Sequence, residues 1–482
     1  VLGVSGASLD ELYDTTAAIE KLGYKELVLN TTGATIKETF ANTVQVRRAC
    51  LDKNPDRTCG YPSLVNLAKL APAAYIAVVV ISLFFTDYAA NLGYKPDFWD
   101  QSRGYHRTGS FFNFCLNTKY LIIRKPSDYN AANVSDYVAE TLKDAGVDPD
   151  DHTVSTNLLT GQNDYTANTD GTMPNIICIM NESLSDPGAL GNLETNEDYM
   201  PFIHSLTENT IKGSLSMPVF GAGTSNSEFE FLSGDSISFL PTGCNVYQSY
   251  VKDTVPSLVS TLGALGYSRT AFHPYYGEGW NRRNVYPLLG FENYISIEDF
   301  VDQDILDTYK QNNDVTEYEM LLNERYPDRN MLLRRFVSDS YDYSMVENMY
   351  ENRDTSKPFF LFNVTMQNHS GYTGEWTNLP REVWLTGDME GKYDTVDQYL
   401  SLIYQSDQAF EYLIDYFSQQ EEPVVILFFG DHWPNLEQDF LSLLLGQDSN
   451  ALSFENVMRE YEVPFLIWAN YDLEGEEIEA VS

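Results

Sequence analysis

The chain has 482 residues, and its 70 Asp and Glu against 30 Lys and Arg give a formal net charge of −40 at pH 7. Nucleic-acid-binding proteins draw their affinity from Lys and Arg that neutralise phosphates, so this balance excludes most nucleic-acid roles, and an anionic partner must be bound locally. The hydrophobic content of 43%, with 33 Tyr and 26 Phe, excludes a disordered acidic chain, and the length suggests two or three domains.

The cysteines point to no special chemistry. There are five, which is too few and too scattered for a disulfide framework, and no Cys-x-x-Cys pair suggests zinc or redox work. We interpret them as small apolar residues or free thiols. They are Cys50, Cys59, Cys115, Cys178 and Cys244.

Residues 1–59 form an N-terminal segment of unknown role. No secretory signal peptide is recognisable at its start. The sequence Ser8-Leu9-Asp10-Glu11 is a capping box, which predicts a mostly polar helix to about Leu22. The segment is therefore expected to be soluble structure, although its sequence does not define a class.

Residues 60–86 are predicted to contain a transmembrane helix. The 17 residues from Leu70 to Thr86 carry no charge, and this length is at the lower limit for spanning a bilayer core of about 30 Å. The alternative is a buried strand over Ile76–Ile81. Basic residues precede the segment and acidic residues follow it, which favours a cytoplasmic N-terminus and an extracellular location for everything after residue 87. These residues are Arg47, Arg48, Lys53, Arg57 and Lys69 before it, and Asp87, Asp97 and Asp100 after it.

The rest of the chain divides into a polar connector and a large α/β domain. Residues 87–170 are expected to be extracytoplasmic, with one helix that begins near Asn133 or Ser135 and ends at Gly146. Residues 171–482 contain apolar runs that suit strands buried on both faces, at 176–180, 359–364, 424–429 and 465–468. Helical patterns at 256–266 and 393–417 lie between them. This alternation predicts an α/β fold with a largely parallel central sheet flanked by helices.

Polar side chains follow three of these runs. Glu182 comes after the first run, His369 after the second, and Asp431 and His432 directly after the third. In an open α/β sheet the carboxyl ends of the strands form the ligand-binding edge. Oxygen and nitrogen ligands of this kind suit a divalent metal such as Mn²⁺, Mg²⁺ or Zn²⁺. The alternative, for a single His near a strand end, is a purely structural role.

A glycine-rich loop precedes a hydroxyl residue. Gly221 and Gly223 allow a tight turn and a close approach to a ligand, and Thr224 after them is expected to begin a helix. Amides at a helix start favour an anion, and a metal-bound hydroxyl there can act as a nucleophile on phosphorus or sulfur. The alternative is an ordinary loop with a capping threonine.

Five motifs follow one another along the chain: Asn181-Glu182-Ser183, Phe220-Gly-x-Gly-Thr-Ser-x-Ser-Glu-Phe229, Trp280-Asn-Arg282, Asn368-His-Ser-Gly-Tyr372 and Phe429-Gly-Asp-His432. In this order they resemble one known family, the lipoteichoic acid synthase group of membrane phosphoglycerol transferases. These transferases belong to the sulfatase-like branch of the alkaline phosphatase superfamily. The resemblance covers about residue 90 to the C-terminus, includes 97–104 and 125–129, and implies a sulfatase-like fold behind a membrane helix.

The resemblance implies a role for each matching residue. Glu182, Thr224, Asp431 and His432 match the metal ligands, the metal usually being Mn²⁺. Thr224 matches the nucleophile, which takes a glycerophosphoryl group from phosphatidylglycerol and leaves diacylglycerol.

Three further residues, Trp280, Arg282 and His369, match the groups that hold the glycerophosphate. Arg282 would offer a planar fork of donors to phosphate. For Trp280 the alternative is core packing, and we interpret the nearby Glu228 and Glu230 as structural.

Three departures from the family pattern limit what the resemblance implies. The family usually carries several membrane helices, of which one is visible here. The family domain typically continues further than Ser482, so residues 171–482 are expected to be a C-terminally incomplete catalytic domain. After His432, the sequence Trp433-Pro-Asn-Leu436 lacks the hydroxyl-bearing continuation of the true polymerases, so phosphoglycerol transfer is a firmer expectation than polymer synthesis.

The sequence thus predicts a metal-dependent phosphoglycerol transferase of the cell membrane with an extracellular catalytic domain. Its expected partners are phosphatidylglycerol or a similar anionic lipid and an acceptor glycolipid or glycan. One alternative is a sulfatase or phosphodiesterase that transfers the group to water, although sulfatases usually need Cys or Ser where Thr224 stands. Another is a non-catalytic envelope protein that binds cations.

Overall fold

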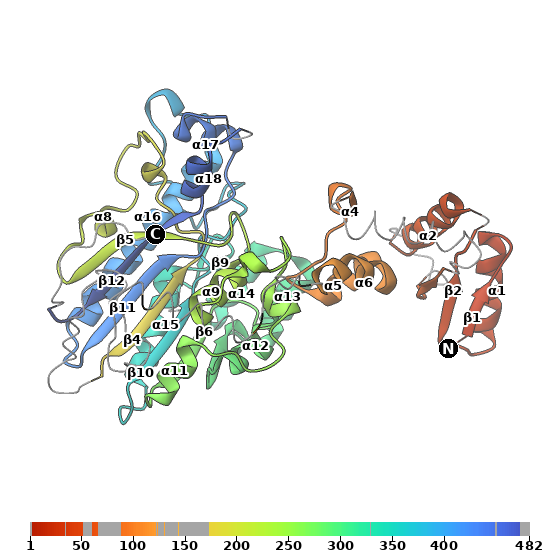
Figure 1. Cartoon of the computed structure of the whole chain (residues 1–482), viewed down its shortest axis with the longest axis horizontal. Helices are drawn as coiled ribbons and strands as arrows, with labels where there is room; N and C mark the ends of the chain where they lie inside the picture. Colours follow the sequence, from red (N-terminus) through yellow and green to blue (C-terminus); the bar gives the residue numbers. More distant parts are fainter. Residues whose placement is uncertain are drawn as a thin grey trace. The chain divides into compact units, whose positions relative to one another are not determined.

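The computed structural model describes residues 2–33, 35–51, 60–65, 88–121, 173–327, 329–448 and 451–472, with the single residues 123, 130 and 143. The chain divides into two compact units, Val1–Ile123 and Arg124–Ser482, each with a sheet of its own (Figure 1). The apolar segment Leu70–Thr86 and nearly all of the helix predicted to end at Gly146 lie outside the described residues. The predicted division into four segments stays a prediction.

The N-terminal unit begins with a small parallel α/β arrangement, in the sheet order β1-β2-β3. Ser8 caps the first helix as predicted, because the amide of Glu11 donates to Ser8 Oγ at 3.2 Å. The Glu11 carboxylate accepts from the amide of Ala7 and not from that of Ser8, so the second half of the predicted capping box is not formed. Apolar residues of the strands and helices form the core, with Val4, Leu12 and Leu29 almost fully buried. The elements are β1 (Leu2–Ser5), α1 (Leu9–Lys21), β2 (Leu27–Asn30), α2 (Ile36–Leu51) and β3 (Ser63–Leu64).

Short helices follow in the same unit. The side chain of Asp100 caps one of them by accepting from the amides of Ser102 and Arg103. Among the described residues, no helix has the length and apolar character needed to cross a membrane. The helices are α4 (Tyr88–Asn91), α5 (Gln101–Thr108), α6 (Ser110–Thr118) and the 3₁₀ helix η3 (Lys119–Leu121).

A mixed, mostly parallel sheet is the centre of the second unit (Figure 1). Five neighbouring strands run parallel, and β12 and β5 at one edge pair antiparallel. All four predicted strands are present, so the predicted α/β class is confirmed. In sheet order the strands are β5 (Thr210–Ser216), β12 (Glu462–Ala469), β11 (Val424–Gly430), β4 (Asn175–Asn181), β10 (Phe359–Val364), β6 (Ser268–His273) and β7 (Asn293–Ser296).

Helices cover both faces of this sheet. Successive residues of a strand point to opposite faces, and in β11 Phe428 stacks on Phe410 of α16 while Phe429 packs on Phe231 of α9. The sheet therefore lies between two layers of helices, which explains why the sequences of its central strands are unbroken apolar runs. The larger helices are α9 (Thr224–Ser233), α11 (Leu258–Ala264), α12 (Arg282–Leu289), α13 (Gln303–Asn312), α14 (Val315–Arg325), α15 (Asp339–Glu351), α16 (Asp394–Ser418) and α17 (Gln438–Leu445).

The remaining elements are short and lie mainly in connections. A two-stranded antiparallel hairpin is formed by β8 (Leu332–Leu333) and β9 (Phe336–Val337). The short helices are η4 (Pro187–Ala189), α8 (Pro201–Ser205), η5 (Ile237–Phe239), α10 (Val246–Ser249), η6 (Gly279–Asn281), η7 (Ile297–Asp299), η8 (Gly387–Met389) and α18 (Phe454–Arg459).

Candidate metal centre and active site

The sheet order brings three predicted site segments to one edge. Strands β11, β4 and β10 are parallel neighbours, and Gly430 at the end of β11 stands in register with Asn181 at the end of β4. Asp431 and Glu182, which directly follow these two strand ends, therefore lie side by side. This is the convergence at the carboxyl edge that the sequence predicted.

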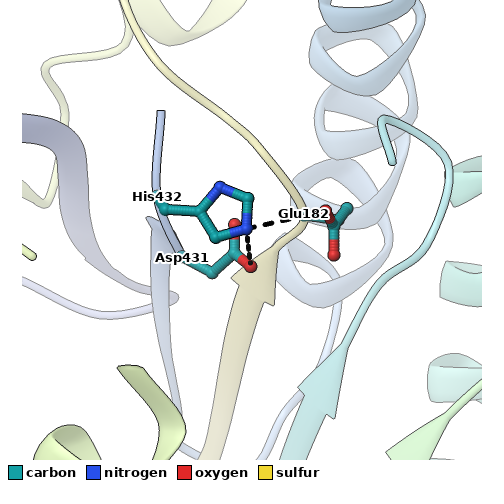
Figure 2. Close-up of side chains that lie close together, drawn as sticks. All are labelled: Glu182, Asp431 and His432. Carbon is teal, nitrogen blue, oxygen red and sulfur yellow. Dashed lines mark ion pairs between the residues drawn. The ribbon is translucent and has the colours of Figure 1, made fainter. Parts of the chain in front are cut away.

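Glu182, Asp431 and His432 form a buried cluster at that edge (Figure 2). One ligand atom from each lies within 4.8 Å of the others. His432 Nε2 is 3.2 Å from Asp431 Oδ2 and 3.9 Å from Glu182 Oε1. All three side chains are almost completely buried, so two carboxyl groups and an imidazole converge on one point out of contact with water.

Neighbouring hydrogen bonds orient these three groups. His432 Nδ1 lies 2.8 Å from the carbonyl oxygen of Trp433, so a proton on Nδ1 leaves Nε2 facing the carboxyl groups as an acceptor. Asp431 Oδ1 accepts from the Ser183 amide at 2.6 Å, and Ser183 Oγ donates to Glu182 Oε1 at 2.9 Å. Asp431 Oδ2 is buried and has no hydrogen-bond partner among the described residues.

The protonation of the cluster follows from its burial and crowding. Burial, and then the charge of Glu182, raises the pKa of Asp431 to about 6. Burial also raises the pKa of Glu182. Burial alone would lower the pKa of His432, but the charges of Asp431 and Glu182 outweigh it and raise this pKa. Two carboxylates forced together favour a cation between them, and the set of oxygen and nitrogen ligands, with an unused oxygen on Asp431, fits a divalent metal ion.

Thr224 joins this cluster from helix α9. Hydrogen bonding by its side chain lowers the pKa of the Glu182 and the Asp431 carboxyl groups, so the hydroxyl lies beside them. Gly223, with φ of 111° in the left-handed region, is the N-cap, and Thr224 is the first helical residue. The alternative of a capping threonine is therefore wrong, because the Thr224 hydroxyl faces the carboxyl groups instead of closing its own helix.

The start of α9 is fixed to the strand that carries Asp431. Ser227 Oγ donates to the carbonyl oxygen of Asp431 at 2.7 Å, and Asn226 Nδ2 donates to that of Cys244 at 3.0 Å. The first six residues of the helix are buried. This anchoring holds the position of the hydroxyl relative to the carboxyl groups.

Arg282 is buried beneath the site and is paired with Glu228. Its Nε and Nη2 both contact Glu228 Oε1, at 3.0 and 2.5 Å, and Tyr286 donates to Glu228 Oε2 at 2.8 Å. The positive charge of Arg282 also lowers the pKa of Glu182, whereas its Nη1 is buried with no partner among the described residues. Arg282 is thus mainly engaged with Glu228, and only Nη1 remains for the predicted contact with a ligand.

Trp280 lies two residues earlier in an unusual backbone conformation. Trp280 and Asn281 have φ of 54° and 68°, both in the left-handed region that bulky side chains rarely adopt. Trp280 is only half-buried, so it is not part of the core as the alternative interpretation supposed. Such strain persists where the surrounding structure imposes it, and functional sites are common places for it.

His369 stands in the loop after β10, near Asp431 and His432. Its ring packs on Phe336 of the β8–β9 hairpin, with ring centroids 5.2 Å apart. Burial lowers its pKa to about 4, and the charges of His432 and Arg335 act in the same direction. The free ring is therefore neutral near pH 7.

Two groups that support this loop were not identified from the sequence. Arg334 is fully buried and donates to the carbonyl oxygens of Gln367, His369 and Gly371 at 2.9, 2.7 and 3.3 Å. Its only sequence signal was a pair of arginines in a strongly acidic chain.

The second group is a buried polar network behind Glu182. Asn181 Nδ2 donates to Asp339 Oδ2 at 2.7 Å, and Asn368 Nδ2 donates to Asn181 Oδ1 at 2.9 Å. Ser406 Oγ also donates to Asp339 Oδ2, at 2.6 Å. The network ties the end of β4 to the loop after β10. Asn181 and Asn368 belong to motifs recognised in the sequence, whereas Asp339 and Ser406 belong to none.

Comparison with known proteins places these observations in a family. Residues 174–482 match the family model described as Sulfatase. The chain is 25% identical over 421 residues to a Rhizobium meliloti protein named "Putative cyclic beta-1,2-glucan modification protein", covering 85% of this chain and 57% of the relative. It is 26% identical over 272 residues to the lipoteichoic acid synthase of Staphylococcus saprophyticus, covering 55% of this chain and 37% of the relative. The chain thus spans just over half the length of the first relative and less than half the length of the second.

A solved structure shares the fold. The Streptococcus pyogenes phosphoglycerol transferase GacH, in complex with sn-glycerol-1-phosphate, is similar with a TM-score of 0.51 and 19% identity over 74% of this chain and 81% of GacH. At this identity the likeness concerns the fold alone. The residues that match the family model make up more than half of the chain, and the chain therefore belongs to the sulfatase family of the alkaline phosphatase superfamily.

Proposed function

We propose that this protein is a metal-dependent phosphoglycerol transferase that moves a glycerophosphoryl group from phosphatidylglycerol to a hydroxyl group of an envelope glycan or glycolipid. The observation that carries the proposal is the hydroxyl of Thr224 at the start of a buried helix, where it lies beside Glu182 and Asp431 and lowers the pKa of both. A hydroxyl held in this way is a nucleophile for a phosphodiester, and Thr replaces the Cys or Ser that sulfatases usually need. The similarity to a lipoteichoic acid synthase and to GacH supports the same choice.

The first half of the reaction forms a covalent intermediate on Thr224. Its oxygen attacks the phosphorus of phosphatidylglycerol, the new Oγ–P bond replaces the bond from phosphorus to the diacylglycerol oxygen, and the Thr224 proton passes to water, because Glu182 and Asp431 would hold the metal. His369 donates the proton that the departing diacylglycerol requires. The pKa of His369 is low in the free protein, but a bound anionic phosphodiester raises it.

The second half reverses these proton transfers. A hydroxyl of the acceptor gives its proton to His369 and attacks the same phosphorus, and Thr224 leaves and takes back a proton from water. Glu182, Thr224, Asp431 and His432 would hold the metal, for which Mn²⁺ is the first choice. When bound, a divalent cation neutralises charge on the phosphoryl oxygens and lowers the pKa of the threonine hydroxyl.

Trp280, Arg282 and His369 are the proposed glycerophosphate-binding groups. Half-exposed Trp280 would form a wall of the site, and Arg282 would contribute mainly the field of its charge and the unused Nη1. We also propose that the protein acts at the outer face of the cell membrane, anchored through residues 60–86. The charge asymmetry around the apolar sequence and the membrane-lipid substrate of the proposed reaction support this location.

The test is the release of diacylglycerol from phosphatidylglycerol by the full chain with added Mn²⁺. Thr224→Ala should abolish release, and the wild type should gain the mass of one glycerophosphoryl group, which the variant does not gain. Ser233→Ala, at the other end of α9, is the control and should keep the wild-type rate. Undiminished release by Thr224→Ala would exclude the covalent mechanism.

The same assay separates the rival functions. Free glycerophosphate formed without any acceptor product would indicate a hydrolase. A purified protein that binds no Mn²⁺, Mg²⁺ or Zn²⁺ and releases no diacylglycerol would indicate a non-catalytic envelope protein.

A further inference from the structure

One arginine at the edge of the site has no polar partner among the residues that the structure describes. The described residues between 173 and 472 contain ten arginines, and Arg335 is the one for which no ion pair or hydrogen bond is found. The other nine bind carboxylates, carbonyl oxygens or hydroxyls: Arg269, Arg282, Arg283, Arg325, Arg329, Arg334, Arg353, Arg381 and Arg459. In a chain with 70 acidic residues, an arginine without a carboxylate is unexpected.

Arg335 occupies the tight turn of the β8–β9 hairpin, next to the loop that carries His369. The two arginines of this turn have different surroundings. Arg334 is buried and binds three carbonyl oxygens of the loop, whereas Arg335 is half-buried. The Nη2 atom of Arg335 lies close to this loop, because a Cβ atom added to Gly371 would be 3.3 Å from it.

An aromatic ring supports the guanidinium group of Arg335. Its Cζ is 4.9 Å from the centroid of the Phe336 ring, which itself packs on His369. Stacking on a ring holds the plane of the guanidinium group without using its N–H donors, which stay available for an anion. The positive charge of Arg335 also contributes to the low pKa of His369, so it acts on the site where phosphate chemistry is proposed.

We propose that Arg335 binds a second phosphate of the substrate, beyond the phosphoryl group that reacts at Thr224. The inference rests on the proposed phosphoglycerol transfer and specifies its substrate as one with at least two phosphates. An arginine fork matches the oxygens of a phosphate group, and no carboxylate of the described chain competes for it. The second phosphate belongs either to a lipid donor with two phosphates, such as cardiolipin, or to an acceptor that already carries a phosphoglycerol unit.

Binding of two soluble probes to the full chain, with saturating Mn²⁺, tests this inference without turnover. The probes are sn-glycerol 1-phosphate, with one phosphate, and deacylated cardiolipin, with two phosphodiesters. Arg335→Gln should weaken binding of the two-phosphate probe about tenfold, which corresponds to loss of one charge-assisted hydrogen-bonding group, and change the one-phosphate probe less than about twofold. Arg335→Lys should restore part of the loss, because the charge remains while the fork does not.

Arg329→Gln is the matched control, because Arg329 also stacks on an aromatic ring, that of Tyr326, in the same unit. It should leave both affinities unchanged, and equal thermal midpoints for the three variants and the wild type would show that all are folded. Equal affinities of Arg335→Gln and the wild type for the two-phosphate probe would overturn the inference. An equal loss for both probes would overturn it as well.

Kinetics then identify the source of the second phosphate. A raised KM for cardiolipin used as the donor in Arg335→Gln, with an unchanged KM for an acceptor that carries a phosphoglycerol unit, assigns it to the donor side, and the reverse assigns it to the acceptor. If the wild type releases no diacylglycerol but binds the two-phosphate probe through Arg335, the proposed function fails while the anion site stands.

Discussion

Some charged side chains of this protein are buried away from water, and the ion pair of Arg282 with Glu228 is the clearest case. Both side chains are almost fully buried, and the pair is closed by Tyr286. Removing one partner of such a pair leaves a buried charge alone, which costs about 3–5 kcal/mol. Glu228→Gln should therefore lower the free energy of unfolding by about this amount, measured by urea denaturation at pH 7.

A neighbouring carboxylate on the same helix provides the control for Glu228. Glu230 is only partly buried and accepts from the amide of Ile237 and the hydroxyl of Ser236. Gln keeps an acceptor oxygen there, so Glu230→Gln should cost less than about 1 kcal/mol. Equal losses in the two variants would contradict the view that the Arg282 charge depends on Glu228.

His204 gives a residue-scale prediction about pH. Hydrogen bonding to Asp186 raises the pKa of His204 to about 9, in spite of partial burial, and Asp198 Oδ1, at 2.8 Å, acts in the same direction. A histidine with a raised pKa stabilises the fold fully below its unfolded pKa of about 6.5, and loses this contribution as the pH rises through the folded value. With 36% of the side chain exposed, solvent screening limits the gain to about 1 kcal/mol.

The expected outcome follows from that sign. His204→Gln should lower the free energy of unfolding by about 1 kcal/mol at pH 6 and have little effect above about pH 9. Urea denaturation of both proteins across this range measures the difference. A difference that grows with rising pH would show that the imidazole is not stabilised by the two carboxylates.

At the scale of elements, the site depends on how closely strand β11 approaches the loop after β4. A Cβ at Gly430 would lie 2.0 Å from the carbonyl oxygen of Leu184, which is backbone and cannot turn aside. Gly430→Ala should push Asp431 and His432 away from Glu182. We expect a loss of about 1–3 kcal/mol in unfolding free energy and weaker Mn²⁺ binding, measured by thermal melts with and without the metal.

A strand glycine in open space provides the comparison. A Cβ at Gly3 in β1 meets nothing within 4 Å, so Gly3→Ala should leave both the stability and the metal affinity near the wild-type values. Unchanged Mn²⁺ affinity in Gly430→Ala would mean that the cluster of Glu182, Asp431 and His432 tolerates movement of the strand end. It would contradict the expectation that the cluster depends on the close packing of Gly430.

The contrast between elements explains what the sequence could predict. Strand β10 is buried at every residue, so its unbroken apolar run was recognisable, whereas β5 is only partly buried throughout and β6 carries polar residues at its start, so neither was predicted. In the N-terminal unit, strands of four residues or fewer gave too short a pattern for an α/β arrangement to be recognised.

The candidate site divides in the same way. Glu182, Asp431 and His432 follow buried strands directly, and their convergence could be predicted because parallel strands end at one edge. The ion pair of Arg282 with Glu228 depends on contacts between segments far apart in the chain, and so do the hydrogen bonds from Arg334 to the loop of His369. No local pattern in the sequence encodes such contacts.

At the scale of the whole molecule, the net charge of −40 opposes an anionic substrate, and only local cations favour it. Repulsion between the chain and an anionic lipid surface acts over the Debye length, about 30 Å at 0.01 M salt and about 8 Å at 0.15 M. The proposed contacts with the metal, Arg282 and Arg335 are short-range and partly buried, so salt screens them less. Salt should therefore weaken the long-range repulsion first.

We accordingly expect kcat/KM for phosphatidylglycerol in anionic mixed micelles to rise several-fold between about 0.01 and 0.15 M NaCl, at constant Mn²⁺. Diluting the lipid into zwitterionic detergent removes most of the surface charge and should flatten this dependence. An enzyme steered to its substrate by a positive field shows the reverse, with the rate falling from the lowest salt concentration onward. Such a fall here would mean that the cationic groups of the site, and not the acidic surface, control the encounter with lipid.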